Sequence, residues 1–567
     1  MEKVWEIKEK KFTDLIAQLL HNRGVATDKL SEEKFLNPDF DQDFHDPKLL
    51  PDFDDAIKRI KRAIDGKEKI GIFADYDADG IPGAALLYKT FQLFGIAPEV
   101  YIPTRQMGYG FNQSGIDYLI EKKCLLIISV DLGIKEFELA KYIAKKNIDL
   151  IITDHHLPEK KLPKALAAVN PKIAGCKYPF KELAGTGVIY KIIQGLGKIY
   201  PEKINEKFLK WNLDLVAIST ISDVVPLLDE NRLIAKFGLK VLAKSRNLGV
   251  RAICQKAALD QTKINAHTVG FQLGPRINAP GRIDHATASF EILITNDKNQ
   301  AQSLANHLET QNLKRQESME EMFKTACRII EKNNLLQNKI LILAQKGWSK
   351  GLIGPVASQL VEKYSRPVVL LSESEKILDG SCRSISGFNI VEALKNVERY
   401  LLGFGGHAGA AGLHLKKSNF SKFSLGLTKF ANKMISNEDL LPKINIDLEL
   451  PKEKIGIRLF QDLEKLEPFG LGNPQPILIT RNIRLISYRF VGRENKHLQL
   501  QFGDGIRKIK GVIFNHEIET EILKAGDFYD IVYSPGLNFW DGKWWLDLRV
   551  IDIKPRLDSE LKLTANG

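Results

Sequence analysis

The sequence predicts an α/β protein: a doubly wound parallel sheet, then a second α/β domain and a small C-terminal β-barrel. Short apolar runs alternate with helical patterns from about residue 66 to 230, and again after about residue 338. From about residue 440 the pattern changes to the alternation typical of strands. With 567 residues, the chain is too long for one hydrophobic core, so we expect several domains.

The expected domain boundaries follow these changes of pattern. A helical preface is predicted because residues 54–64 are amphipathic at helical spacing. A polar connector without glycine or proline is predicted to be one or two long helices, and an OB-fold is the natural candidate for the barrel. Asp541-Gly542 predicts a hairpin turn there. The ranges are 1–65 for the preface, 66–295 for the first α/β domain, 296–337 for the connector, 338–435 for the second α/β domain, 440–556 for the barrel and 557–567 for a tail.

Composition restricts the compartment and the partners. A formal net charge of +12 favours a polyanionic partner, although a lysine-rich host proteome would give the same excess. Five scattered cysteines without a C-x-x-C pair predict reduced thiols. No apolar run approaches the ~20 residues that span a bilayer, and the N-terminus lacks the apolar core of a signal peptide. We therefore expect a cytoplasmic protein that does not bind membranes.

The most informative motif is the acidic segment Asp75-Tyr-Asp-Ala-Asp-Gly80, which lies between an apolar strand-like run and a helical pattern. Its three carboxylates would repel one another unless a cation lies between them. A calcium-binding EF-hand loop also begins in this way, but it needs a glutamate at position twelve and helical flanks. Leu86 occupies that position and the upstream flank is strand-like, so the EF-hand interpretation fails.

Three other predicted elements also end in acids or histidines: Asp131, Asp154-His155-His156 and Asp223. Ligands of open α/β sheets bind beyond the carboxyl ends of the strands, so these groups should meet in one crevice, with Asp223 supplied by a helix. Many carboxylates with one or two imidazoles suit Mn²⁺ or Mg²⁺ better than zinc. They suffice for two ions about 4 Å apart, as in phosphodiester hydrolysis. Alternatively, each aspartate could simply cap a helix.

Together these four motifs resemble those of the DHH phosphoesterase superfamily. Later segments are similar to the RecJ family of bacterial single-strand-specific 5′→3′ DNA exonucleases, and the resemblance runs from Arg23-Gly24 to about residue 555. One departure is Phe73, where superfamily members such as family II pyrophosphatases carry a metal-binding histidine. The later segments are Gly274–Arg282, Ser381–Ser384, Gly405–Gly412 and Leu466–Pro474.

The resemblance implies a hydrolase that degrades single-stranded DNA from the 5′ end to 5′-mononucleotides in DNA repair and recombination, with two Mn²⁺ or Mg²⁺ ions. It places His156 near the scissile phosphate, with Asp131 and Asp77 also catalytic. Asp75 is either a ligand or a neighbour of one. The implied metal ligands are Asp75, Asp77, Asp79, Asp131, His155 and Asp223.

Candidate substrate-binding residues lie in both α/β domains. The glycine-rich segment with Gly405, Gly406 and His407 would let backbone N–H groups and a helix start approach a phosphate, unless it only packs tightly. Ser381 and Arg383 suit a terminal-phosphate pocket. Arg276, Asn278 and Arg282 are further candidates, which would either hold strand phosphates or orient the metal carboxylates. Arg105 and Tyr109 would line the same cleft, unless they form a plain turn.

The predicted barrel carries a basic stretch that suits a single strand. Tyr488, Phe490 and Phe502 are interleaved with its cations, and a basic groove with stacking aromatic rings binds single strands without sequence preference. Such rings are also the usual core of a small barrel. The cations singled out are Arg489, Arg493, Lys508 and Lys510.

Two other functions are alternatives to the exonuclease. A nano-RNase or cyclic-dinucleotide phosphodiesterase of the same superfamily would be shorter and lack the barrel. A non-catalytic single-strand-binding scaffold would be expected to lose metal carboxylates, and all are present here. We expect a monomer that binds single-stranded DNA, with single-strand-binding protein and a helicase as candidate protein partners.

Overall fold

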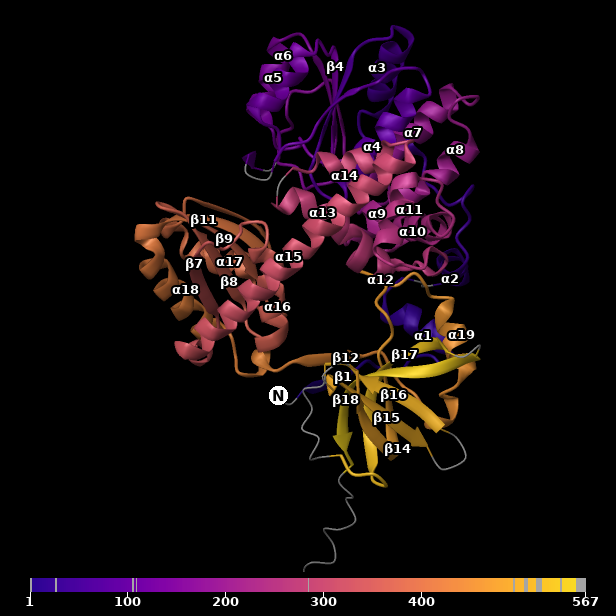
Figure 1. The fold of residues 1–567 in the computed structure, drawn as a ribbon, viewed down its shortest axis with the longest axis vertical. Coiled ribbons are helices and arrows are strands. Elements are labelled where there is room, and N and C mark those ends of the chain that lie inside the picture. Colours follow the sequence, from indigo (N-terminus) through magenta and orange to yellow (C-terminus); the bar gives the residue numbers. More distant parts are fainter. Residues whose placement is uncertain are drawn as a thin grey trace, which may run out of the picture. The chain divides into compact units, whose positions relative to one another are not determined.

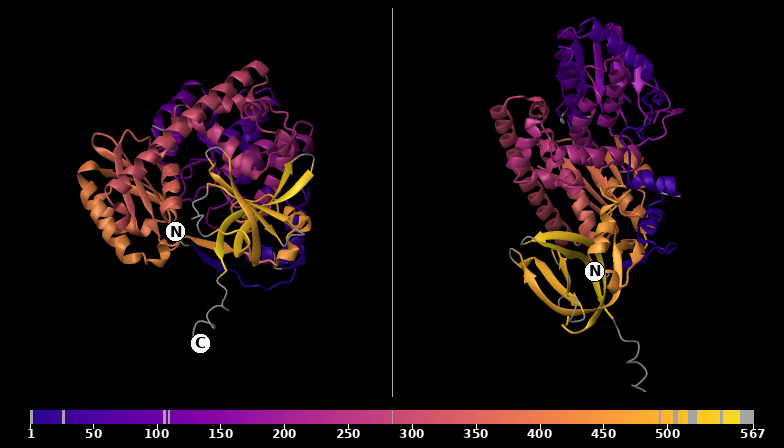
Figure 2. Two further views of the ribbon diagram at one scale, coloured as in Figure 1. Left: turned by 60° about the horizontal axis from the view of Figure 1, so that its bottom comes forward. Right: turned by 90° about the vertical axis from the view of Figure 1, so that its right-hand side faces the viewer.

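A computed structural model describes residues 3–25, 28–104, 107–108, 110–283, 285–492, 495–503, 508–515, 523–540 and 543–556. The chain forms two compact units, each described by itself below (Figures 1 and 2). One unit comprises Phe44–Val225 and Leu233–Pro442, and the other Met1–Asp43, Pro226–Arg232 and Lys443–Gly567. Within the described residues, no helix combines the length and the apolar composition that a membrane crossing needs.

The first sheet of the larger unit has five parallel strands in the order β3-β2-β4-β5-β6. β2 and β4 are buried along their whole length because helices cover both faces, which confirms the predicted doubly wound fold (Figure 1). The strands are β2 (Ile70–Ala74), β3 (Glu99–Tyr101), β4 (Leu126–Val130), β5 (Asp149–Thr153) and β6 (Ala167–Val169), and the helices of this region are α3 (Phe53–Asp65), α4 (Gly80–Gln92), α5 (Gln113–Glu121), α6 (Phe137–Lys145), α7 (Gly185–Ile199), α8 (Glu206–Trp211) and α9 (Leu213–Ser222).

Helices follow this sheet up to the connector. The connector is one long helix, α15 (Lys298–Lys332), and the side chain of its N-cap residue Asp297 accepts a hydrogen bond from the N–H of Gln300. The segment 276–282 is helical. The elements are α10 (Asp229–Leu242), α11 (Leu248–Lys256), α12 (Ala266–Thr268), the π-helix η4 (Val269–Leu273), α13 (Gly274–Ile283) and α14 (Thr287–Ile294).

The second sheet of the larger unit has the order β10-β11-β9-β8-β7, in which only β7 and β8 pair in parallel. The glycine-rich segment is a hairpin of β10 and β11, not a loop before a helix; the prediction of a helix start was wrong. Gly405, Gly412 and Ser381 are paired across three strands, where small residues keep the sheet surface open. The elements are β7 (Leu341–Lys346), α16 (Ile353–Tyr364), β8 (Val368–Glu373), β9 (Ile377–Arg383), α17 (Ile390–Asn396), β10 (Gly403–His407), β11 (Ala410–Lys416) and α18 (Phe420–Met434).

The smaller unit is built on a barrel that the β14–β17 pairing closes. Alternate residues of β15, Leu498, Leu500 and Phe502, are fully buried in its core. The strands are β13 (Leu448–Glu449), β14 (Leu478–Val491), β15 (His497–Gly503), β16 (Lys508–Ile513), β17 (Phe528–Trp540) and β18 (Lys543–Pro555), with α19 (Ile457–Glu464) beside them. The predicted turn at Asp541-Gly542 and the tail 557–567 lie outside the described residues.

The N-terminal segment differs from the all-helical preface that was expected. Its first element is a strand, β1 (Val4–Ile7), which pairs in parallel with β12 (Lys443–Ile446). The two strands lie at opposite ends of the sequence, so no local pattern indicates their pairing. Helices α1 (Leu15–Asn22) and α2 (Lys29–Leu36) then pack on the core of the barrel unit, to which Leu19, Leu20 and Phe35 contribute.

Candidate metal centre and nucleic-acid interface

The acidic loop after β2 is held in shape by its own backbone. Asp77 Oδ1 accepts hydrogen bonds from Asp79 N–H (2.8 Å) and Gly80 N–H (3.1 Å). A Cβ at Gly80 would lie 2.6 Å from the carbonyl oxygen of Asp75, so only glycine allows this turn. Asn278 Oδ1 accepts the N–H of Ala78 at 2.7 Å. Of the two roles predicted for Asn278, the structure therefore favours support of the acidic loop.

Asp79 is the most firmly held carboxylate of the cluster. It accepts hydrogen bonds from Gly185 N–H (2.6 Å), Thr186 N–H (2.7 Å) and Ser219 Oγ (2.6 Å). The first two donors belong to the start of α7, where unpaired N–H groups favour an anion. None of these three residues was predicted from the sequence. The glycine-threonine-glycine run before an apolar helix was an available signal for Gly185 and Thr186, and Ser219 had none.

Asp131 follows β4 and lies at the centre of the cluster. Its φ of +64° is rare for a residue with a side chain, and short polar residues such as aspartate tolerate it best. Its Oδ1 lies 3.2 Å from His155 Nε2 and 3.7 Å from His156 Nδ1. Burial, and then the charges of the surrounding aspartates, raise the pKa of Asp131 well above its usual range.

The two histidines after β5 are oriented differently. His155 is buried, and its Nδ1–H donates to the carbonyl oxygen of Leu183 at 2.9 Å, which leaves Nε2 without a proton and directed at the carboxylates. His156 is partly exposed, and its Nδ1–H donates to Asp154 Oδ1 at 2.8 Å. Burial opposes a positive charge on His156, yet the hydrogen bond and charge of Asp154 raise its pKa overall.

Asp223 is placed at the end of α9, as predicted. Its Oδ2 lies 3.6 Å from His155 Nε2. Burial, and then repulsion from Asp79 and Asp77, raise its pKa well above the usual range. The next residue, Val224, is 63% exposed with a φ of +57°, which is strained for a β-branched side chain. Such strain at a ligand-bearing helix end fits a functional site.

These side chains form three overlapping groups that could each hold a metal ion. In each group the ligand atoms lie within 4.8 Å of one another. The donors are mainly carboxylate oxygens with one or two imidazoles. Burial first, and then the neighbouring carboxylates, raise the pKa of Asp131 and of Asp223, and a cation would relieve that repulsion. The residues therefore fit Mn²⁺ or Mg²⁺. The groups are Asp75, Asp77 and Asp131; Asp79, His155 and Asp223; and Asp131, His155 and His156.

The predicted terminal-phosphate residues lie together at the start of α16. Arg383 donates from Nη1 to Ser381 Oγ (3.1 Å) and to the carbonyl of Cys382 (2.8 Å). A Cβ at Gly354, the second residue of α16, would lie 3.1 Å from Arg383 Nη2 and 3.2 Å from Ser381 Oγ. A guanidinium, a hydroxyl and a helix start without a side-chain cap make a suitable anion pocket.

The other predicted strand-binding residues of the larger unit differ in their surroundings. Arg276 binds Glu309 through two hydrogen bonds of 2.6 and 3.2 Å, so it ties α13 to α15. Arg282 donates to the carbonyl of Gly351 at 2.9 Å. Gly405, Gly406 and His407 are exposed on the β10–β11 hairpin. Arg105 and Tyr109 lie outside the described residues.

The barrel separates its cations from its aromatic rings. Arg489, Lys508 and Lys510 pair with Gln499, Gly503 and Gln501 of β15, which alternate with its buried core residues and so lie on the outward face. Two of the named aromatics lie on the other face of β14: Tyr488 and Phe490 pair with Leu500 and Leu498, and are 36% and 43% exposed. Phe502 is core, and Arg493 lies outside the described residues.

Comparisons with known proteins identify three domains in the chain. The DHH family N-terminal domain matches residues 69–220, the DHHA1 domain 337–433 and the RecJ OB domain 446–552. Fold and site together define a DHH-type phosphoesterase with a DHHA1 domain and an OB barrel. Among its relatives are the single-stranded-DNA-specific exonucleases RecJ of Bacillus subtilis (37% identity over 94% of this chain and 66% of the relative) and Haemophilus influenzae (32% over 90% and 92%). The chain belongs to the RecJ family.

Solved structures show the same fold. The Mn²⁺ complex of RecJ from Thermus thermophilus matches with a TM-score of 0.81 and 24% identity, over 98% of this chain and 80% of that one. Another structure, exonuclease RecJ bound to manganese, matches with a TM-score of 0.58 and 29% identity, over 69% and 98%. The RecJ of Thermus thermophilus has also been solved with Mg²⁺.

Proposed function

We propose that this protein is a metal-dependent exonuclease that hydrolyses single-stranded DNA from the 5′ end to 5′-mononucleotides. The observation that carries the proposal is the convergence of Asp131, His155 and His156 with the acidic loop at one edge of the parallel sheet. The relatives named above supply the substrate class, and the resemblance to their family supplies the polarity. Repair and recombination of DNA is the corresponding cellular role.

The ligand groups suggest two ions that share Asp131. Asp75 and Asp77 would hold one ion, while Asp79, His155 and Asp223 would hold the other. Bound ions of this kind lower the pKa of a water and neutralise charge on the phosphate. The hydrogen bonds to Asp79, and the one from His155 to the Leu183 carbonyl, fix these side chains before any ion arrives.

His156 is the residue that we assign to the substrate. Asp154 fixes its ring through Nδ1, so Nε2 is the ring nitrogen that would donate to a phosphate oxygen. Its raised pKa keeps the ring cationic to higher pH, which suits the developing negative charge of phosphodiester cleavage. Asp154 itself is held by N–H groups of His155, His156 and Ile134, so we assign it a positioning role.

Two further sites would select and hold the strand. Ser381 and Arg383 at the start of α16 would bind a 5′-terminal phosphate, and the outward cations of the barrel would bind phosphates further along. Arg383→Ala should reduce the preference for 5′-phosphorylated over 5′-hydroxyl ends. An unchanged preference would place the terminal-phosphate pocket elsewhere. We further propose a cytoplasmic monomer that works with single-strand-binding protein and a helicase.

One experiment tests the main proposal. Oligonucleotides labelled at the 5′ or the 3′ end are incubated with the protein and Mn²⁺, as single strands and as blunt duplexes. We expect early release of labelled mononucleotide only from the 5′-labelled single strand, and no release by Asp131→Ala. Early release of a 3′ label would refute the polarity, and equal degradation of duplexes would refute the substrate class.

A further inference from the structure

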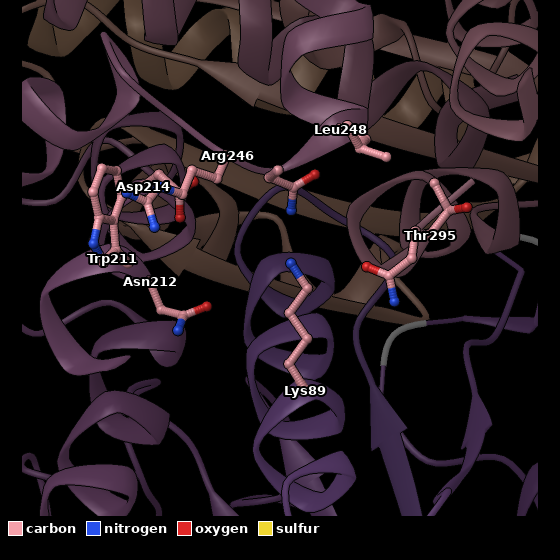
Figure 3. Close-up of a pocket in the computed structure, with 9 residues that line it drawn as sticks. Lys89, Trp211, Asn212, Asp214, Arg246, Leu248 and Thr295 are labelled. Atoms are coloured by element: carbon pink, nitrogen blue, oxygen red, sulfur yellow. The ribbon is translucent and has the colours of Figure 1, made fainter. Parts of the chain in front are cut away.

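A polar pocket lies in the larger unit outside the metal cluster (Figure 3). It has a volume of about 180 Å³, room for roughly six water molecules. Its lining is rich in hydrogen-bond donors: Lys89, Trp211, Asn212, Asp214, Arg246, Asn247, Leu248, Thr295 and Asn296. The proposed chemistry of strand cleavage uses none of these residues.

Lys89 places a cation in this pocket. Its side chain extends from α4 toward the space between Arg246 and Thr295 (Figure 3). Burial lowers the pKa of Lys89, and the nearby charge of Asp214 opposes that effect. Within the described part of the chain, its ammonium group makes no hydrogen bond or ion pair. A partly buried cation with three free donors is costly unless an anion or water binds it.

Arg246 adds a second cation with free donors. Its guanidinium group lies over the Trp211 ring, 4.0 Å from the centroid, and is otherwise exposed. Stacking fixes the plane of the guanidinium while its N–H edge stays available for a bidentate contact with a phosphate or carboxylate. Among the described residues we find no hydrogen-bonded partner for that edge.

The acid of the pocket is already satisfied. Asp214 accepts hydrogen bonds from Ser245 Oγ (2.6 Å) and Leu215 N–H (2.8 Å), so it does not need Lys89 as a direct partner. Two helices, α9 and α11, also begin beside the pocket, at Leu213 and Leu248, and their N-termini add positive potential. The two cations and the helix starts outweigh the one carboxylate, so the local field favours an anion.

From these contacts we propose that the pocket between α4, α9 and α11 binds a small phosphate-bearing anion through Lys89 and Arg246. The pocket is distinct from the metal cluster. Lys89 and Asp214 each stand nine residues from the cluster end of their helices, Gly80 and Asp223, which is about 13 Å along a helix. Two of the three helices, α4 and α9, are therefore capped at their other ends by the candidate metal ligands Asp79 and Asp223. The phosphate comes from a free diphosphate-like molecule or from the backbone of a bound strand.

The test uses the full-length protein in EDTA, so that divalent ions do not bring phosphate to the metal cluster. Pyrophosphate is titrated by calorimetry into wild type, Lys89→Met, Arg246→Gln and Arg383→Ala. Hydrogen bonds to charged groups are worth about 1.5–3 kcal/mol, so each of the first two changes should weaken binding by roughly 10- to 100-fold. Lys244→Met, an exposed lysine two residues from Arg246, is the matched control and should bind normally.

The outcomes separate this site from the others. Loss of pyrophosphate affinity in Lys89→Met and Arg246→Gln with normal binding by Lys244→Met supports the proposal, whether or not Arg383→Ala removes a separate binding event. Unchanged affinity in Lys89→Met, or loss only in Arg383→Ala, overturns it. A parallel titration with a single-stranded oligonucleotide identifies the source: an equal loss in Lys89→Met and Arg246→Gln assigns the phosphate to the strand, and normal strand binding assigns it to a free molecule.

Discussion

Gly185→Ala should damage the metal centre from a position that carries no ligand. Gly185 is the first residue of α7, and a Cβ there would lie 2.6 Å from Asp131 Oδ1 and 2.7 Å from Asp131 Cβ. Ordinary contact begins at 3.4 Å, so the carboxylate must move by roughly 0.8 Å. Ligand distances tolerate only about 0.2 Å. We expect Mn²⁺ affinity to fall about 10- to 100-fold, and kcat about 100-fold.

The same helix provides the control. A Cβ at Gly187, two residues further on, would lie 3.5 Å from side-chain atoms of Leu183, an ordinary contact, so Gly187→Ala should leave activity intact and stabilise α7 by about 0.5–1 kcal/mol. Calorimetry with Mn²⁺ on chelator-treated protein and release of mononucleotide from a 5′-phosphorylated strand measure both variants. If Gly185→Ala matched Gly187→Ala in both assays, Asp131 would not be a ligand held in place by packing.

Three other predictions follow from the site and the barrel. Because the pKa of Asp131 is raised in the folded state, its contribution to stability is present below the pKa of the unfolded state and is lost as pH rises through the folded pKa. Asp131→Asn should therefore raise the melting temperature in EDTA at neutral pH and make the melting temperature depend less on pH. An unchanged melting temperature would contradict this prediction. His156→Ala should lower kcat at least 100-fold with normal metal content, and loss of bound metal in this variant would make His156 a metal ligand. Because Asp154 raises the pKa of His156, Asp154→Asn should shift the alkaline limb of the pH profile of kcat to lower pH. The outward cations of the barrel are Arg489, Lys508 and Lys510. Reversing their charges should weaken the binding of long strands more than that of short ones, and should reduce the slope of log affinity against log salt by about 0.7 per lost contact. Wild-type binding by this variant would show that these cations form only a solvated face.

The strand ends of the first sheet were predictable because their pattern is local. Each of Asp75, Asp131 and Asp154 follows an apolar run of strand length, and parallel strands bring their carboxyl ends to one edge. The strands of the barrel were predictable for the same reason, since alternation is encoded within a few residues, whereas the β14–β17 pairing that closes it joins distant segments.

Contacts between distant residues were not predictable. Arg276 has the composition and context of a strand-binding arginine, but its partner is Glu309 on another helix. Glycine-rich segments are equally ambiguous: Gly405 and Gly406 suit a phosphate loop or an open hairpin, and only the pairing with Gly412 and Ala411 decides for the hairpin. In each case the deciding information is the identity of a tertiary neighbour.

Two aspartates that look equivalent in the sequence have opposite surroundings in the structure. Asp154 is buried, but it accepts hydrogen bonds from His156 and from backbone N–H groups, and these lower its pKa despite the burial. Asp131 is equally buried among other carboxylates, so its pKa rises. Environments that separate the pKa values of like residues assign them different tasks. We therefore propose that Asp154 stays ionised and keeps His156 oriented and protonated, whereas Asp131 is the carboxylate whose charge a metal ion would compensate.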